Sequence, residues 1–87
     1  MKYVVLYGGA TDMAKAREHF AEHRAGYQPF IADRTLLMIG PFTDPARGAL
    51  GVFTTREAAE AFVQQDPFVA RGVVSSWEIV EWNEVLT

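Results

Sequence analysis

The 87-residue chain contains no cysteine, no long apolar run and no cluster of basic residues. Without cysteine it has no disulfide, no thiolate nucleophile and no Cys/His set for a structural zinc ion. Its eight lysines and arginines are scattered singly in a chain of net charge −3, which argues against a nucleic-acid partner. No segment approaches the ~20 apolar residues of a membrane span, and the run after Lys2 is too short for a signal peptide. We therefore expect a cytoplasmic protein with neither a nucleic-acid nor a membrane partner.

What the chain does contain is the composition of a folded domain. Hydrophobic residues make up 49% and charged residues 22% of the sequence. The length permits one domain over 1–87, and a domain of this size buries only roughly 60–65% of its unfolded surface. Since its core is thin and has no covalent staple, a second subunit is the expected source of additional stability.

Turn residues separate four strand patterns. Runs of β-branched, aromatic and aliphatic residues predict strands at 3–7, 35–42, 49–54 and 73–82. The first is expected to end in a turn at Gly8-Gly9, and the unbroken apolar run of the second is typical of a central strand buried on both faces. The second and third strands are expected to form a hairpin.

Two helices are expected between these strands. The first follows a cap at residue 11 or 12, and its apolar residues recur at intervals of three, four or seven. Pro29 removes a backbone hydrogen bond, so we expect a kink or a break there, with a second helical piece to about residue 32. The second helix follows the capping-box pattern Thr54-x-x-Glu57 and ends at Asp66-Pro67, where a short helical turn to about residue 71 begins.

The order β-α-β-β-α-β predicts an α+β ferredoxin-like protomer, in which both helices cover one face of an antiparallel sheet. The other face is not polar, because each strand has apolar residues in both phases. An exposed apolar sheet is a liability for a small monomer. We therefore predict a homodimer with twofold symmetry, its sheets packed together. Large aromatic residues are expected in the core or the interface: Phe30, Phe42, Phe53, Phe62, Phe68, Trp77 and Trp82.

Histidine is the side chain that titrates near neutrality, and both histidines lie on the first predicted helix. His23 falls about 40° from the centre of the apolar stripe, and His19 about 80° away. His23 is therefore expected to face the sheet and His19 to face solvent. Taken alone, a histidine at the margin of a core is more often structural than catalytic.

Asp66, which precedes Pro67, has the pattern of a helix N-cap. A carboxylate that caps a helix with one oxygen can hold an imidazole with the other, which fixes the ring's tautomer and raises its basicity. His23 and Asp66 both lie on the helical side of the predicted sheet, although nothing local shows that they meet. His23 is therefore the candidate catalytic group and Asp66 its candidate partner.

Other groups have less specific signals. His19 to His23 matches the zinc-protease pattern H-x-x-E-H, but the chain is too short for such an enzyme and no metal is expected. Tyr7 and Phe68 belong either to the core or to the wall of a pocket. Arg71 either binds a substrate carboxylate or neutralises Asp66.

Six segments together resemble the YciI-like (YCII-related) family of small dimeric α+β barrel proteins. They are 1–6, 19–24, 35–42, 56–62, 66–73 and 77–82, and they span nearly the whole chain. The most specific combination is His23, Gly40-Pro41 and Asp66-Pro67-Phe68 at these spacings. The resemblance implies a dimeric barrel and a His–Asp dyad, with His23 and Asp66 in those positions. Candidate substrate-binding residues are Tyr7, Pro41, Phe68 and Arg71.

Two functional hypotheses of different classes follow. In the first, the protein is a cofactor-independent enzyme in which His23 transfers protons on a small cyclic or aromatic-derived substrate, by isomerisation or elimination. The resemblance supports this, because some relatives and the similar muconolactone isomerases act on cyclic products of aromatic degradation. In the second, the protein is a non-catalytic dimeric module that binds a small ligand or a partner chain. A monooxygenase-like use of the same fold, also without a cofactor, is a third alternative.

Overall fold

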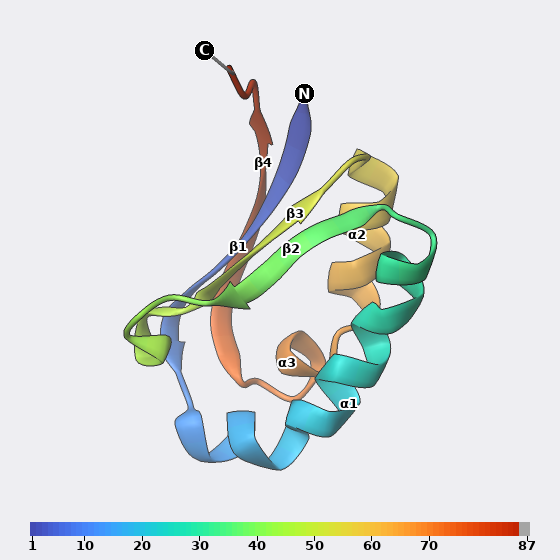
Figure 1. Ribbon diagram of the computed structural model, residues 1–87. Helices are drawn as coiled ribbons and strands as arrows, with labels where there is room; N and C mark the ends of the chain where they lie inside the picture. Colours follow the sequence, from blue (N-terminus) through green and yellow to red (C-terminus); the bar gives the residue numbers. More distant parts are fainter. Residues whose placement is uncertain (86–87) are drawn as a thin grey trace.

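The computed structural model describes residues 1–85 and has the predicted order of strands and helices (Figure 1). A single turn of 3-10 helix, η1, joins the second and third strands, and a short third helix precedes the last strand. The elements are β1 (Lys2–Thr11), α1 (Met13–Ala32), β2 (Leu36–Pro41), η1 (Pro45–Arg47), β3 (Ala49–Phe53), α2 (Arg56–Gln65), α3 (Pro67–Ala70) and β4 (Val74–Trp82).

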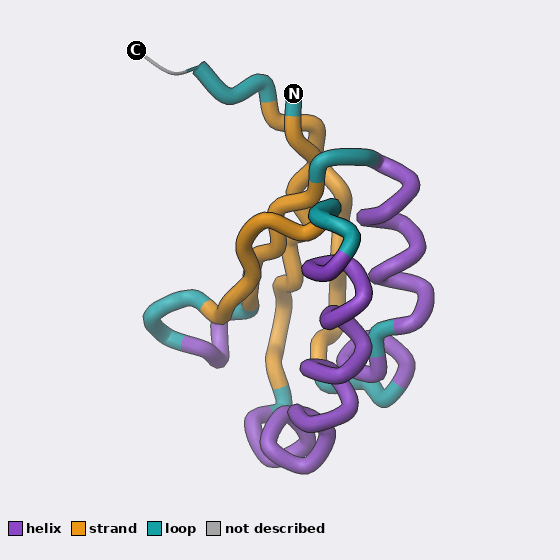
Figure 2. Tube along the Cα trace, turned by 45° about the vertical axis from the view of Figure 1, so that its right-hand side comes forward, coloured by secondary structure: helices purple, strands orange, loops and turns teal. Residues whose placement is uncertain are grey.

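The four strands form one antiparallel sheet in the order β2-β3-β1-β4. The three α-helices cover one face of this sheet and leave the other without a helix (Figures 1 and 2). The fold is therefore the predicted ferredoxin-like α+β protomer, and β2 and β3 form the predicted hairpin. No helix among residues 1–85 is long and apolar enough to cross a membrane.

The core lies between the sheet and the helices. Phe53, Phe62 and Val73 are almost fully buried there, and the rings of Phe53 and Phe62 lie 5.3 Å apart. Alternation along β1 directs Val5 and Tyr7 into this core, whereas the intervening residues face the uncovered side of the sheet. Because Tyr7 points to the helices, its hydroxyl group reaches the functional site described below.

Helix caps agree with the sequence pattern, with one correction. Asp12 caps α1 by accepting the backbone N–H of Lys15. The expected cap of α2 at Thr54 is wrong by one residue: Thr55 accepts the N–H of Ala58. The backbone N–H of Thr54 instead pairs with the carbonyl of Thr35, one residue beyond the end of β3 and one before the start of β2.

The turn expected at Gly8-Gly9 is also wrong, because β1 continues through both glycines to Thr11. The pairing with β4 shifts register between Gly8 and Thr11 and then resumes, with Thr11 opposite Val74. A shift of this kind is a β-bulge, which glycine accommodates readily. The bulge redirects the end of β1 toward the start of α1.

The second strand does not occupy the predicted central position. β2 lies at the edge of the sheet, and Leu37 and Met38 within it are 47% and 58% exposed. The apolar run reflects a strand with one face on the core and the other open to solvent in the single chain. Some of the aromatic residues expected in the core or the interface are also exposed in the protomer. They are Phe42, Trp77 and Trp82.

Pro29 does not break the first helix. α1 continues from Met13 to Ala32, and Pro29 lies in its last turn, where only the bond that its own nitrogen would donate is lost. Figure 1 shows that α1 instead changes direction in its first half, where it passes from the bottom of the view to the right-hand side. The break predicted at Pro29 is therefore wrong.

Candidate functional site

The centre of the candidate site is a contact between α1 and the junction of α2 and α3. His23 is 7% exposed, and its Nδ1 lies 2.7 Å from Oδ1 of Asp66. An ionised carboxylate only accepts hydrogen bonds, so the ring proton lies on Nδ1 and is donated to Asp66. The two residues, separated by 43 positions in the sequence, therefore meet as a buried hydrogen-bonded pair.

Asp66 is fully buried and receives three donors. Oδ1 accepts His23 and also the backbone N–H of Phe68 at 3.2 Å, the capping bond at the start of α3. Oδ2 accepts the hydroxyl group of Tyr7. The cap and the histidine contact therefore coexist as expected, but they share one oxygen, and the second oxygen holds a tyrosine.

Tyr7 gives the pair a third member. Burial, the charge of Asp66 and the hydrogen bond to it together raise the pKa of Tyr7 far above its usual range. Tyr7 therefore remains a protonated donor at any physiological pH. Its position in the chain gave no signal of this contact, because the contact depends on the phase of β1 and on the fold that brings Asp66 beneath it.

Aromatic rings enclose His23. Phe68 stacks on the imidazole with ring centroids 3.9 Å apart and planes 9° from parallel, and Tyr27 and Phe62 meet it edge-on. Among residues 1–85, the buried polar side-chain atoms without a hydrogen-bond partner are Thr11 Oγ1 and Glu84 Oε2. Nε2 of His23 has no hydrogen bond to another of the described residues, so its lone pair is available to a ligand.

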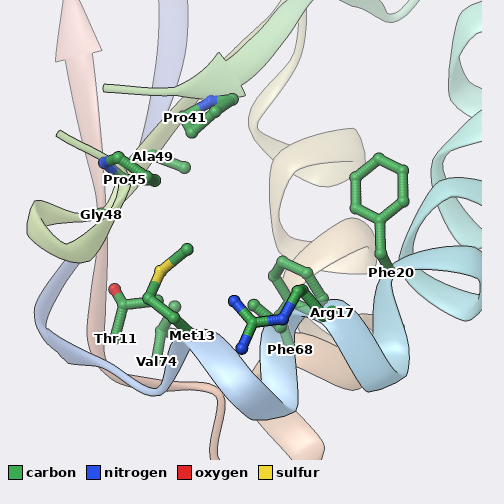
Figure 3. Close-up of a pocket in the computed structure, with 11 residues that line it drawn as sticks. Thr11, Met13, Arg17, Phe20, Pro41, Pro45, Gly48, Ala49, Phe68 and Val74 are labelled. Carbon is green, nitrogen blue, oxygen red and sulfur yellow. The ribbon is translucent and has the colours of Figure 1, made fainter. Parts of the chain in front are cut away.

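A cavity of about 220 Å³ opens beside this cluster, between the start of α1 and the end of the β2–β3 hairpin (Figure 3). A cavity of roughly 150 Å³ is enough to hold benzene, so this one has room for one substituted ring. Its walls are almost entirely apolar. The lining residues are Thr11, Met13, Ala16, Arg17, Phe20, Pro41, Pro45, Gly48, Ala49, Phe68 and Val74.

The cavity and His23 are neighbours but are not in direct contact. Phe68 lines the cavity and also stacks on the imidazole. His23 borders a smaller space of about 10 Å³ together with Tyr7 and Ala49, and Ala49 also lines the larger cavity. The smaller space is barely large enough for a water molecule. Phe68 and Ala49 are therefore the residues that connect the pair to the cavity.

The candidate substrate-binding residues divide into two groups. Pro41 and Phe68 lie in the cavity wall, as a substrate contact requires. Tyr7 does not line this cavity and instead binds Asp66. Arg71 also lies elsewhere: it is more than half exposed and its guanidinium group is 3.6 Å from Glu22, so it does not neutralise Asp66.

Sequence reasoning missed the first turns of α1 as part of the cavity. The cavity-lining residues of this part of α1 are spaced three, one and three positions apart, so they share one face of the helix. They are Met13, Ala16, Arg17 and Phe20. This spacing was visible in the sequence. The hairpin end that closes the opposite side was not, because its position depends on the tertiary packing.

The H-x-x-E-H pattern does not assemble into a metal centre in the part of the chain that the structure describes. No group of three or more histidine, aspartate or glutamate side chains there is placed to hold a metal ion. His19 Nδ1 lies 3.2 Å from Glu22 Oε1 on the outer side of α1, whereas His23 is turned inward to Asp66. The two rings therefore have separate partners.

The fold and site define a ferredoxin-like α+β protomer with a buried histidine–aspartate pair. The YCII-related domain matches residues 1–83, and the chain therefore belongs to the YCII-related family. No curated protein matches the sequence significantly. Among solved structures the fold is similar to 5-chloro-2-hydroxyhydroquinone dehydrochlorinase (TftG) from Burkholderia phenoliruptrix AC1100, in complex with 2,5-dihydroxybenzoquinone. The TM-score is 0.77 at 18% identity, over 98% of this chain and 96% of the other.

Proposed function

We propose that the protein is a cofactor-independent enzyme that transfers a proton on a small cyclic or aromatic-derived substrate. The observation that carries the proposal is the buried His23–Asp66 hydrogen bond, which leaves the lone pair of Nε2 unpaired; an apolar cavity lies on the other side of Phe68. In this assignment Nε2 is the general base, and Asp66 orients the ring and stabilises its protonated form. Tyr7 holds the second oxygen of Asp66 and is a positioning residue.

The proposed step needs no external oxidant or reductant. Nε2 takes a proton from the substrate, and the electron pair left behind forms a new double bond within it. In an elimination, the carbon–chlorine bond breaks and chloride leaves with its electron pair. In an isomerisation, the imidazolium returns the proton to another atom of the same substrate. Either reaction requires one positioned acid–base group, which contributes about 10²–10⁴-fold to the rate.

The proposed place for the substrate ring is the 220 Å³ cavity. Phe68 belongs to α3, a helix of only four residues, and its ring covers one face of His23. We assign Phe68 the role of a movable wall: when its ring turns aside, the substrate takes its place against the imidazole. Such rearrangements of short segments on binding are common in enzymes.

The structurally similar dehydrochlorinase indicates which substrate to test first. Purified protein incubated under nitrogen with 5-chloro-2-hydroxyhydroquinone should release one chloride per ring and form the corresponding hydroxyquinone. Nitrogen is needed because hydroquinones oxidise in air. Chloride is measured with an ion-selective electrode and the quinone by its absorbance. The absence of chloride release, and of any proton exchange between substrate and heavy water, would contradict the enzymatic assignment.

The alternative is a non-catalytic module that binds a small ligand. The separation between His23 and the larger cavity favours it, because a ligand could occupy the cavity without meeting the imidazole. In that case a ring compound binds the wild-type protein and a His23 variant equally, and neither changes the compound chemically. The same incubation therefore distinguishes the two functions.

We further propose that the active form is a homodimer. The strand registers align Met38, Val52, Val4 and Val80 in one apolar row across all four strands, on the face without helices. Beside this row, Leu50 lies opposite Leu6 on the same face. Val4 and Val52 in the centre of the row are already buried in the protomer, whereas Met38 and Val80 at its ends are exposed. A second copy of the chain offers an identical row, so sheet-to-sheet packing about a twofold axis would cover the exposed ends of both.

Replacing Val80 with lysine should convert the dimer to a monomer. Val80 is 39% exposed in the protomer and lies at the β4 end of the apolar row, so a charge there would be buried without a partner in the dimer. Light scattering coupled to size exclusion should give twice the chain mass for the wild type and one chain mass for Val80→Lys at micromolar concentration. Gln64→Lys, which makes the same charge change on the exposed side of α2, should remain dimeric. A monomeric wild type would contradict the proposal.

A further inference from the structure

The larger cavity contains one cationic side chain, Arg17. Figure 3 shows its guanidinium group extended between Met13 and Phe68, on the side of the cavity formed by α1. The other cavity residue with a polar side chain is Thr11, and its hydroxyl oxygen is buried away from the open space. A bound ring would therefore meet carbon on nearly every side, including the apolar stem of Arg17, with the guanidinium group at the margin of the cavity.

Arg17 has no acidic partner among residues 1–85. Two other arginines do have one: Arg56 binds Glu81 at 2.9 Å, and Arg71 lies 3.6 Å from Glu22. On α1, the positions three and four residues from Arg17 are Met13, Ala14, Phe20 and Ala21, so the helix itself supplies no carboxylate. The charge at the cavity is therefore available to a ligand.

From this juxtaposition we infer that the ligand of the cavity is a small planar ring bearing an anionic oxygen substituent, and that Arg17 is the residue that selects for it. The inference deepens the proposed function, since it names the charge of the substrate at the same site. An apolar wall favours the ring, and a guanidinium group binds an ionised oxygen by charge-assisted hydrogen bonds. A phenolate, an enolate of a quinone and a ring carboxylate share this chemistry.

The bound ring also has a defined orientation. Arg17 and Phe68 both line the cavity, and Phe68 stacks on His23. A ring whose anionic oxygen is held by Arg17 presents its remaining positions to Phe68 and, once Phe68 turns aside, to Nε2. Arg17 is thus a binding residue that positions the ring, and His23 acts on an atom distant from the anion.

The test compares the binding of two single rings by isothermal titration calorimetry. One is 2,5-dihydroxybenzoquinone, which is anionic at neutral pH, and the other is hydroquinone, which is neutral. Arg17→Met keeps the apolar stem and removes the charge, so the dissociation constant of the anion should rise about tenfold while that of hydroquinone changes less than twofold. Arg17→Lys should restore most of the affinity for the anion.

Arg24→Gln is the matched control, because Arg24 lies exposed on the same helix and does not line the cavity. It should leave the binding of both rings unchanged. Equal loss of the anion's affinity in the Arg24 variant would reveal a general effect of net charge and overturn the inference, as would unchanged binding by Arg17→Met. The binding measurement requires no turnover. If the protein binds the anion through Arg17 but has no enzymatic activity, only the proposed function is contradicted. If neither ring binds, the proposed function and the role of Arg17 are both overturned.

Discussion

Replacing His23 with glutamine should lower the rate of the proposed reaction by about 10²–10⁴-fold, the usual contribution of a positioned general base. Glutamine can donate its amide N–H to Oδ1 of Asp66, as Nδ1 of His23 does at 2.7 Å. It has no basic nitrogen to replace Nε2, so the chemical step loses its proton acceptor. The measurement is the initial rate of chloride release, with the thermal melting curve recorded for the same preparation.

His19→Gln is the appropriate control for that experiment. His19 lies one turn before His23 on α1, but its ring binds Glu22 on the outer side of the helix. This variant should keep the wild-type rate. If His23→Gln turns over substrate at the full rate while folded, His23 is not the base and the proposed mechanism is wrong.

The general architecture could be predicted because it depends on local patterns. The strand and helix order, the β2–β3 hairpin and the short helix after Asp66-Pro67 follow from alternation, capping residues and turn residues. The errors occur where tertiary contacts override a local signal. Gly8-Gly9 is a bulge and not a turn, because β4 continues to pair with β1 beyond it.

The His23–Asp66 contact was predictable for a different reason. The helical angle placed His23 toward the sheet, and the capping pattern placed Asp66 at the start of a helix on the same side, but the family resemblance was needed to join them. Tyr7 as the third member required the actual position of β1 above Asp66. The cavity likewise depends on how the hairpin end lies against α1, which no spacing in the sequence encodes.

The apolar pattern of the second strand was identified correctly, but the place of that strand in the sheet was predicted wrongly. The run Leu36 to Ile39 is apolar in both phases, and we interpreted it as a central strand, yet β2 lies at the edge. Leu36 and Ile39 face the core, and Met38 belongs to the apolar row on the open face. The second phase of the pattern therefore suits an intermolecular contact, which is the role that the proposed dimer gives it.

The second large effect is expected from Asp66→Ala, which should lower the free energy of unfolding by about 3–5 kcal/mol, a large fraction of the roughly 5–15 kcal/mol typical of a domain. The physical reason is the number of donors that Asp66 satisfies while fully buried: Tyr7, His23 and the N–H of Phe68. Urea denaturation gives the change, because the midpoint falls in proportion to the lost free energy when the slope is constant.

Asp12→Ala separates this effect from the ordinary loss of a helix cap. Asp12 is also an aspartate N-cap, but it is exposed and accepts a single bond, from Lys15, so its loss should cost only about 1 kcal/mol. A similar loss for both variants would mean that the buried contacts of Asp66 add nothing to stability. Tyr7→Phe removes one of the three donors and should fall between them, near 1.5–3 kcal/mol.

Asp66→Asn then separates the charge of Asp66 from its hydrogen bonds. With the amide oxygen in the place of Oδ1, asparagine still accepts His23 and the N–H of Phe68, and its amide nitrogen donates to the hydroxyl oxygen of Tyr7. This variant should therefore remain folded with the proton of His23 still on Nδ1, which the nitrogen chemical shifts of the ring report. Its turnover should nonetheless fall by at least about tenfold, because no negative charge stabilises the imidazolium formed in the proton transfer. An Asp66→Asn protein with wild-type turnover would show that Asp66 acts only as a structural acceptor and that His23 needs no charged partner.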